Sequence, residues 1–146
     1  MNPVFRELAN NTTLIAAIVS WVLAQFIKFG LGIIEGEFDL TRLTSSGGMP
    51  SGHAALVSAV TVGVGREYGF FSGNFALAAV IALIVMYDAT GVRQAVGIQA
   101  RIMNEILHDI YRGSGPTPVK LREILGHTSV EVIAGAILGL AVSIMI

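Results

Sequence analysis

Two short runs in this sequence each place a histidine directly before a long apolar stretch. Residues 47–53 read GGMPSGH, and residues 126–131 read GHTSVE. If a helix begins at each run, its first unpaired backbone N–H groups favour a bound anion. An imidazole can pass a proton to a leaving oxygen or attack phosphorus as a nucleophile. The two runs together therefore predict a site that holds a phosphate ester and breaks it.

In the first run, each of three consecutive residues has a possible chemical role. Ser51 can cap the following helix, and Gly52 lets an oxyanion approach the backbone closely. His53 can then donate a proton to the leaving oxygen. The alternative is an ordinary serine cap beside a polar histidine at a membrane interface, and the tetrapeptide alone leaves both open.

In the second run, His127 and Glu131 stand four residues apart and so share one face of a helix. A carboxylate there can accept the imidazole N–H and make the other ring nitrogen more basic, which suits a nucleophile. However, Thr128 with Glu131 also fits a capping box, in which the glutamate is purely structural. One glutamate can also fill both roles.

Phosphate oxygens need cations, and arginine suits them through its bidentate fork. The candidates are Lys28, Arg42, Arg93, Lys120 and Arg122. Each can instead be a snorkelling or topology-setting residue. Arg93 stands out because it closely follows Asp88 and Gly91 at the end of an apolar run. Asp88 can pair with Arg93, orient a histidine, or simply be a polar residue at a helix end.

Little in the sequence indicates a cofactor. Cysteine is absent, which excludes disulfides, thiolate catalysis and cysteine-ligated metals. A metal held by His53, Asp88 and His127 is an alternative that no local spacing supports. There is neither a Walker-type loop nor a nucleophile elbow.

The composition indicates an integral membrane protein. Of 146 residues, 53% are hydrophobic and 13% charged, and the mean hydropathy is +0.72. Soluble domains carry roughly 25% charged residues. The net charge of −1 gives no indication of nucleic-acid binding. The N-terminal segment lacks a small-residue cleavage site, so we expect a retained first helix rather than a signal peptide.

The chemical residues must be positioned by helices, because the apolar runs are long and contain few breaks. We predict one all-α domain over residues 1–146, with a surface turn at Arg66 and Glu67. The predicted apolar helices are 13–31, 54–64, 75–87 and 130–146. Between 92 and 112, apolar residues recur at alternating spacings of four and three, which predicts an amphipathic helix. It either continues the third span or lies in the membrane interface.

The distribution of basic residues predicts the orientation. The segments 28–53 and 88–128 together carry seven of the nine Lys and Arg residues, and Arg6 and Arg66 are the other two. By the positive-inside rule, the side with both histidine runs faces the cytoplasm.

The Pro-Ser-Gly-His run and the later His-x-x-x-acid run together resemble the type 2 phosphatidic acid phosphatase superfamily, which includes the vanadium haloperoxidases. The runs 47–53, 87–93 (YDATGVR) and 121–128 (LREILGHT) look like its small divergent branch. The resemblance extends from Lys28 to the end of the chain.

This resemblance implies a metal-independent phosphomonoesterase that acts through a phosphohistidine. It implies that Ser51 and Gly52 bind phosphate, that His53 protonates the leaving group and that His127 is the nucleophile. Glu131 stands where the superfamily has aspartate. The two basic motifs of the superfamily are not matched residue by residue, because the spacings of Lys28 to Arg42 and of Arg122 to His127 differ. Arg93 is therefore our first choice for a phosphate-binding cation, with Arg122 and Lys28 as further candidates.

We therefore expect a membrane phosphatase for a lipid phosphate, such as a polyprenyl phosphate or diphosphate or a phosphatidate. The alternatives are a non-catalytic binder or transporter of phosphorylated lipid, and a helical structural subunit. Gly135 and Gly139 suit close helix packing, which suggests a homodimer.

Overall fold

The computed structural model describes residues 2–34, 36, 47–110 and 126–146. These residues form helices joined by turns, and no strand occurs among them. The helices are α1 (Pro3–Ala9), α2 (Thr12–Ile34), α3 (Gly52–Tyr68), α4 (Gly73–Thr90), α5 (Val92–Ile110) and α6 (Ser129–Met145). The predicted all-α membrane bundle is confirmed, and each predicted helical segment forms a helix.

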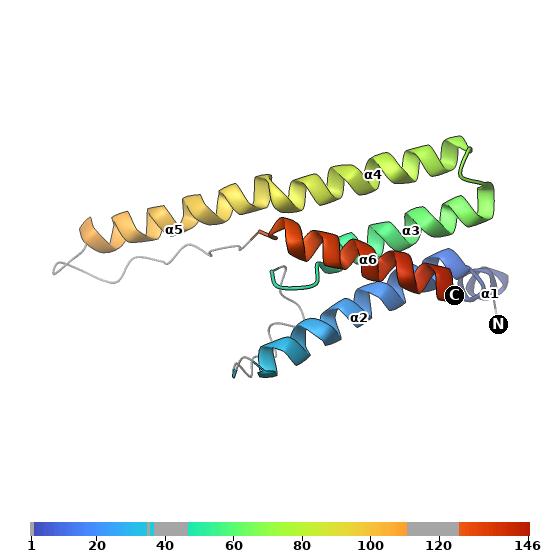
Figure 1. Cartoon of the computed structure of the whole chain (residues 1–146), viewed down its shortest axis with the longest axis horizontal. Helices are drawn as coiled ribbons and strands as arrows, with labels where there is room; N and C mark the ends of the chain where they lie inside the picture. Colours follow the sequence, from blue (N-terminus) through green and yellow to red (C-terminus); the bar gives the residue numbers. More distant parts are fainter. Residues whose placement is uncertain (1, 35, 37–46, 111–125) are drawn as a thin grey trace.

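Helix α3 is the centre of the bundle, because it packs against α2, α4 and α6. Figure 1 shows α3 and α6 running in the same direction, with α2 and α4 running in the opposite one. The starts of α3 and α6 and the ends of α2 and α4 therefore lie at the same end of the bundle. Both histidine runs belong to this end, as does the end of α4 that precedes Arg93.

The bundle buries small residues and exposes large apolar ones. Its buried apolar residues are alanines, with two valines: Ala16, Ala17, Ala24, Ala54, Ala55, Ala59, Ala82, Ala89, Val132 and Val142. Large side chains such as Phe26, Leu83 and Ile137 are more than 60% exposed. A water-soluble protein does not present so large an apolar surface. Small residues at helix contacts and large ones outside are typical of helices packed in lipid.

Within the part of the chain that the structure describes, two helical stretches are long and apolar enough to cross a membrane. They are Thr12–Ile34, and Gly73–His108 taken as one stretch of 36 residues, while Ser129–Met145 is a shorter apolar helix. At 1.5 Å per residue, the 23 residues of α2 span about 34 Å, which exceeds the ~30 Å hydrocarbon core.

Glycines set how closely α3 and α6 approach. A Cβ built on Gly135 would overlap the carbonyl oxygen of Ser51, and one on Gly139 would overlap that of Ala55. Both glycines are thus used inside the chain, between α6 and α3. The observation that suggested a homodimer has an intramolecular explanation, and the homodimer stays a prediction.

Two details of the expected helices were wrong. Helix α1 was not anticipated, although Asn2 caps it and Pro3 occupies its first turn, both common signals of a helix start. The predicted turn at Arg66 and Glu67 is the last turn of α3, which ends at Tyr68. Gly65 permits close packing rather than breaking the helix, since a Cβ there would meet Phe70 and Phe75.

Candidate functional site

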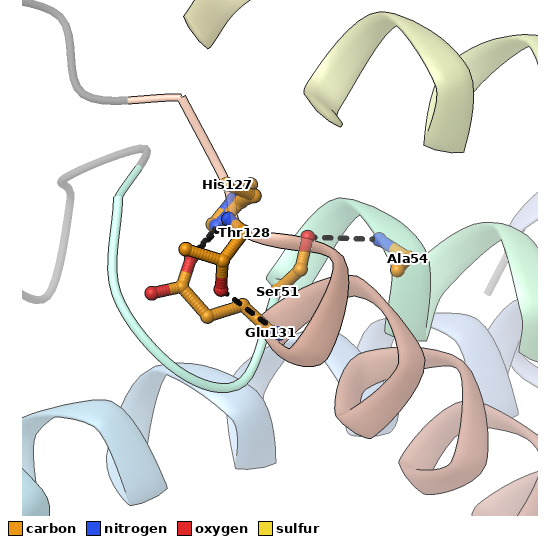
Figure 2. Close-up of polar contacts among 5 residues, drawn as sticks. All are labelled: Ser51, Ala54, His127, Thr128 and Glu131. Atoms are coloured by element: carbon orange, nitrogen blue, oxygen red, sulfur yellow. Dashed lines mark hydrogen bonds and ion pairs between the residues drawn. The ribbon is translucent and has the colours of Figure 1, made fainter. Parts of the chain in front are cut away.

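The site is organised around the buried imidazole of His127, whose side chain is only 2% exposed. Its Nδ1 lies 3.0 Å from Oε2 of Glu131, one turn further along the chain (Figure 2). Its Nε2 is buried and has no hydrogen-bond partner among the described residues. A neutral imidazole that donates from Nδ1 to the carboxylate has its lone pair on Nε2. The predicted contact of His127 with Glu131 is therefore present, and the role of His127 as a nucleophile stays a prediction.

Glu131 makes both of the contacts that the sequence left open. The Thr128 hydroxyl accepts a hydrogen bond from the Glu131 backbone N–H at 3.4 Å, and Glu131 Oε2 accepts one from the Thr128 N–H at 3.0 Å. Together these bonds form a capping box at the start of α6. The same Oε2 contacts His127, as Figure 2 shows. The cap therefore fixes the carboxylate in the place from which it orients the imidazole.

Ser51 caps α3, as predicted, and joins the start of α3 to the start of α6. Its hydroxyl accepts a hydrogen bond from the Ala54 N–H at 3.4 Å, and the residue is fully buried. Its own N–H donates to the carbonyl of Glu131 at 2.9 Å. The first turns of the two helices are therefore adjacent, at the same end of the bundle.

The end of α4 holds His127 from another side. The His127 backbone N–H donates to the carbonyl of Ala89 at 3.0 Å. Ala54, Ala89 and Val132 form a buried apolar cluster, which joins the three helices. Asp88 precedes Ala89 and is half-buried at the same end. The structure thus brings the YDATGVR run to the second histidine, which local spacing could not predict.

Lys28 is a buried cation close to this cluster. It is 4% exposed, although it lies within the apolar helix α2, and it interacts electrostatically with Glu131. A Cβ built on Gly48 would lie 3.3 Å from both Cγ and Cδ of Lys28, so the loop before α3 packs on the lysine stem. Gly48 also has a φ of +89°, which favours glycine. Lys28 is therefore a component of the site end and not a snorkelling residue.

The first histidine run is placed differently from the second. His53 is exposed on the first turn of α3. Gly52 is buried, and a Cβ on it would lie 3.1 Å from Cδ1 of Trp21 and 3.9 Å from Cδ of Gln25. The missing side chain of Gly52 thus allows α2 to approach the start of α3. Close approach of an oxyanion to this glycine stays a prediction.

The remaining candidates for phosphate-binding cations lie partly or wholly outside the described residues. Arg93 falls in the first turn of α5, but its side chain lies outside the described residues, as do Arg122, Arg42 and Lys120 entirely. Within the described part of the chain, no three His, Asp or Glu side chains gather in a way that could hold a metal ion.

Sequence reasoning did not anticipate that Trp21 and Gln25 adjoin the site end. Gln25 is 9% exposed, and its Oε1 has no hydrogen-bond partner among the described residues. A signal was present, because Trp21, Gln25 and Lys28 recur at helical spacing on one face of an apolar helix.

Known protein sequences resemble the chain over nearly its whole length. The profile of the Divergent PAP2 family matches residues 9–142. The chain belongs to this family. It is also similar to the uncharacterized membrane protein YuiD of Bacillus subtilis (strain 168), with 36% identity over 152 residues that cover 96% of each chain. No solved structure matches. The resemblance to a divergent phosphatidic acid phosphatase branch is confirmed, and the protein is a membrane protein of phosphatase-like type.

Proposed function

We propose that this member of the Divergent PAP2 family hydrolyses a lipid phosphate through a phosphohistidine at His127. The observation that carries the proposal is the unequal bonding of the two nitrogens of the His127 imidazole. Glu131 fixes Nδ1 at 3.0 Å, while the buried Nε2 has no partner among the described residues. Burial of a polar atom without a hydrogen-bond partner is unfavourable. A ligand that bonds to Nε2 most readily explains why this atom is buried without one.

In the first step, the Nε2 lone pair forms a bond to phosphorus while the bond from phosphorus to the ester oxygen breaks. The leaving oxygen takes a proton from His53. The phosphorylated imidazole keeps its Nδ1 proton and carries a positive charge, which the Glu131 carboxylate stabilises. Because Nε2 is shielded from solvent, the substrate must displace the groups that cover it.

In the second step, water attacks phosphorus and passes a proton to His53, which is now neutral. The bond from phosphorus to Nε2 breaks, inorganic phosphate leaves, and both histidines return to their starting states. The cycle needs no metal or organic cofactor, because the protein supplies the nucleophile and the proton donor.

Two adjacent helix starts would hold the phosphate in this scheme. The first turns of α3 and α6 are joined by the bond from Ser51 N–H to the Glu131 carbonyl, and both have positive dipole ends. Ser51 and Gly52 belong to this region, with Lys28 as the buried cation beside it. Arg93 and Arg122 are proposed as further cations for the phosphate oxygens, and Asp88 as a supporting residue.

The proposed substrate is amphiphilic, because the site lies at the end of an apolar bundle. A lipid tail can stay in the hydrocarbon while the phosphate reaches the helix starts. A polyprenyl phosphate or diphosphate and a phosphatidate both meet this description. We place the site on the cytoplasmic side of a multi-pass protein because seven of the nine basic residues belong to that side.

Phosphate release by the purified protein in mixed micelles tests the proposal. We expect turnover on a short-chain lipid phosphate without added metal, and its loss in His127→Asn. His53→Asn should slow release of an alcohol by at least ~10², the usual scale of acid catalysis. It should slow release of nitrophenol much less, because that leaving group needs no proton. His108→Asn, on the exposed polar face of α5, is the matched control.

Loss of turnover in His127→Asn with retained lipid binding would support the enzyme. Binding of the lipid phosphate without turnover by the unaltered protein would instead favour the binder or transporter. Equal turnover of His127→Asn and the unaltered protein would refute the phosphohistidine.

A further inference from the structure

Helix α5 presents an apolar face that the rest of the described chain leaves uncovered. Figure 1 shows α5 continuing the direction of α4 beyond the start of α6. Its extensive packing among the described helices is with α4 alone. The exposed apolar residues are Val92 (57%), Val96 (46%), Ile98 (55%), Ile102 (50%), Met103 (48%), Ile106 (48%) and Ile110 (69%). The opposite face carries Arg101, which pairs with Glu105 at 3.2 Å, and His108.

The lengths of α4 and α5 exclude a single straight span. Together they form a helical stretch of 36 residues over Gly73–His108, about 54 Å long at 1.5 Å per residue. The hydrocarbon core is ~30 Å thick, and the 18 residues of α4 already span about 27 Å. Helix α5 therefore begins where α4 reaches the headgroups. Because it is continuous with α4, its apolar face starts close to the membrane surface.

The breadth of the apolar face favours a lipid surface over a partner helix. A two-stranded coiled coil buries two positions in seven. On α5, Met103 and Ile106 belong to such a seam, but Ile98 and Ile102 lie outside it and are half exposed too. Such a wide apolar arc opposite a polar face is the pattern of helices that lie in the membrane interface.

The junction between the helices has local features that permit a bend. The Thr90 hydroxyl donates to the carbonyls of Met86 and Tyr87, both at 3.2 Å. Such back-bonding often bends helices, and sharp bends occur at glycine. Gly91 follows, with φ −104° and ψ −79°, away from the usual helical values. In the structure α5 continues the direction of α4 (Figure 1), and a change of direction at these two residues would let α5 turn onto the membrane.

We propose that α5 lies on the membrane surface with its apolar face in lipid and that it thereby fixes the depth of the site. Ala89 immediately precedes this junction, and its carbonyl accepts the His127 N–H at 3.0 Å. An α5 held at the headgroup level therefore holds the end of α4, and with it His127, at the depth of lipid phosphates. The surface helix rests on the fold alone, while the depth consequence also rests on the proposed function.

The natural absence of cysteine allows a direct test in the full-length protein. Single cysteines replace Met103, Ile106, Arg101 and His108 in turn, and each carries a nitroxide in phosphatidylcholine vesicles. Spin relaxation by oxygen, which partitions into lipid, is compared with relaxation by a water-soluble nickel chelate. We expect Met103→Cys and Ile106→Cys to favour oxygen several-fold more than Arg101→Cys and His108→Cys. Leu83→Cys, exposed on α4, is the control for a lipid-facing position.

Because the two arginines and two acidic residues of α5 balance, adding anionic lipid should change these ratios little. Nickel access at Met103 and Ile106 equal to that at Arg101 would place α5 in water and overturn the proposal. Spectral broadening between labels at Met103 on two copies would show a dimer contact and also overturn it. A label at Met103 shielded from both reagents would mean protein packing, with the same consequence.

Discussion

Exchange of Glu131 for glutamine separates helix capping from orientation of the imidazole. One carboxylate oxygen accepts both the Thr128 N–H and the His127 Nδ1–H, each at 3.0 Å. The oxygen of glutamine can still accept both bonds, but without charge. A hydrogen bond to a charged group contributes about 1.5–3 kcal/mol to stability, and one between neutral groups contributes about 0.5–1.5 kcal/mol. The exchange therefore lowers the contribution of the two hydrogen bonds by about 2 kcal/mol in total. Lys28 also loses a charged neighbour, which adds to the destabilisation.

The stability loss is modest compared with the expected loss of rate. In a chain of this size, about 2 kcal/mol lowers the melting temperature by about 4–8 °C, so the protein stays folded at 25 °C. If the carboxylate stabilises a phosphorylated, cationic His127, turnover should fall by at least ~10², or about 2.7 kcal/mol in the barrier. In the catalytic triad of serine proteases, exchange of the aspartate that orients the histidine for asparagine lowers kcat about 10⁴-fold.

Thr128→Ala is the matched control, because it damages the same cap from its other side. It removes the hydroxyl that accepts the Glu131 N–H at 3.4 Å and leaves the contact of Glu131 with His127 intact. Loss of such a cap destabilises by about 0.5–2 kcal/mol, close to the loss in Glu131→Gln. Turnover on a short-chain lipid phosphate and melting in the same detergent should separate the two variants. If Glu131→Gln turns over within about threefold of Thr128→Ala, a gap far smaller than the expected ~10², the glutamate only caps the helix.

Two further predictions concern packing and orientation. Gly139→Ala should destabilise the protein by about 1–3 kcal/mol in thermal melts, because its methyl group would overlap the Ala55 carbonyl. The control is Gly30→Ala, which has open space around it and should change stability by less than ~1 kcal/mol. Equal melting temperatures of the two variants would refute the close α3–α6 contact. A single cysteine between residues 113 and 118 should react with an impermeant reagent only from the cytoplasmic side of vesicles, as the excess of basic residues predicts, and labelling from the other side would reverse the orientation.

Local patterns in the sequence predicted the parts of the site that depend on neighbouring residues. Four-residue spacing placed Glu131 beside His127, and the Thr-x-x-Glu pattern predicted the capping box. Each inference needed only the geometry of one helical turn. The amphipathic α5 was predicted for the same reason, since its periodicity is a local property.

Contacts between distant segments could not be predicted from such patterns. The bonds from His127 N–H to Ala89 and from Ser51 N–H to Glu131 join residues 38 and 80 positions apart in the sequence. They depend on how the helices cross, which is set by small residues along whole faces. The position of Arg93 relative to the histidines is of the same kind, and its side chain lies outside the described residues.

The arrangement of helix ends explains why a carboxylate belongs at this place even without substrate. Helices α3 and α6 run in parallel and start side by side, so their positive dipole ends repel each other. The close contact at Gly135 prevents them from moving apart without loss of packing. Two groups offset this repulsion, namely the Glu131 carboxylate and the Ala89 carbonyl at the end of the antiparallel α4. A bound phosphate would add negative charge where two helix starts and Lys28 favour it, so the packing that unites the bundle also favours an anion beside His127.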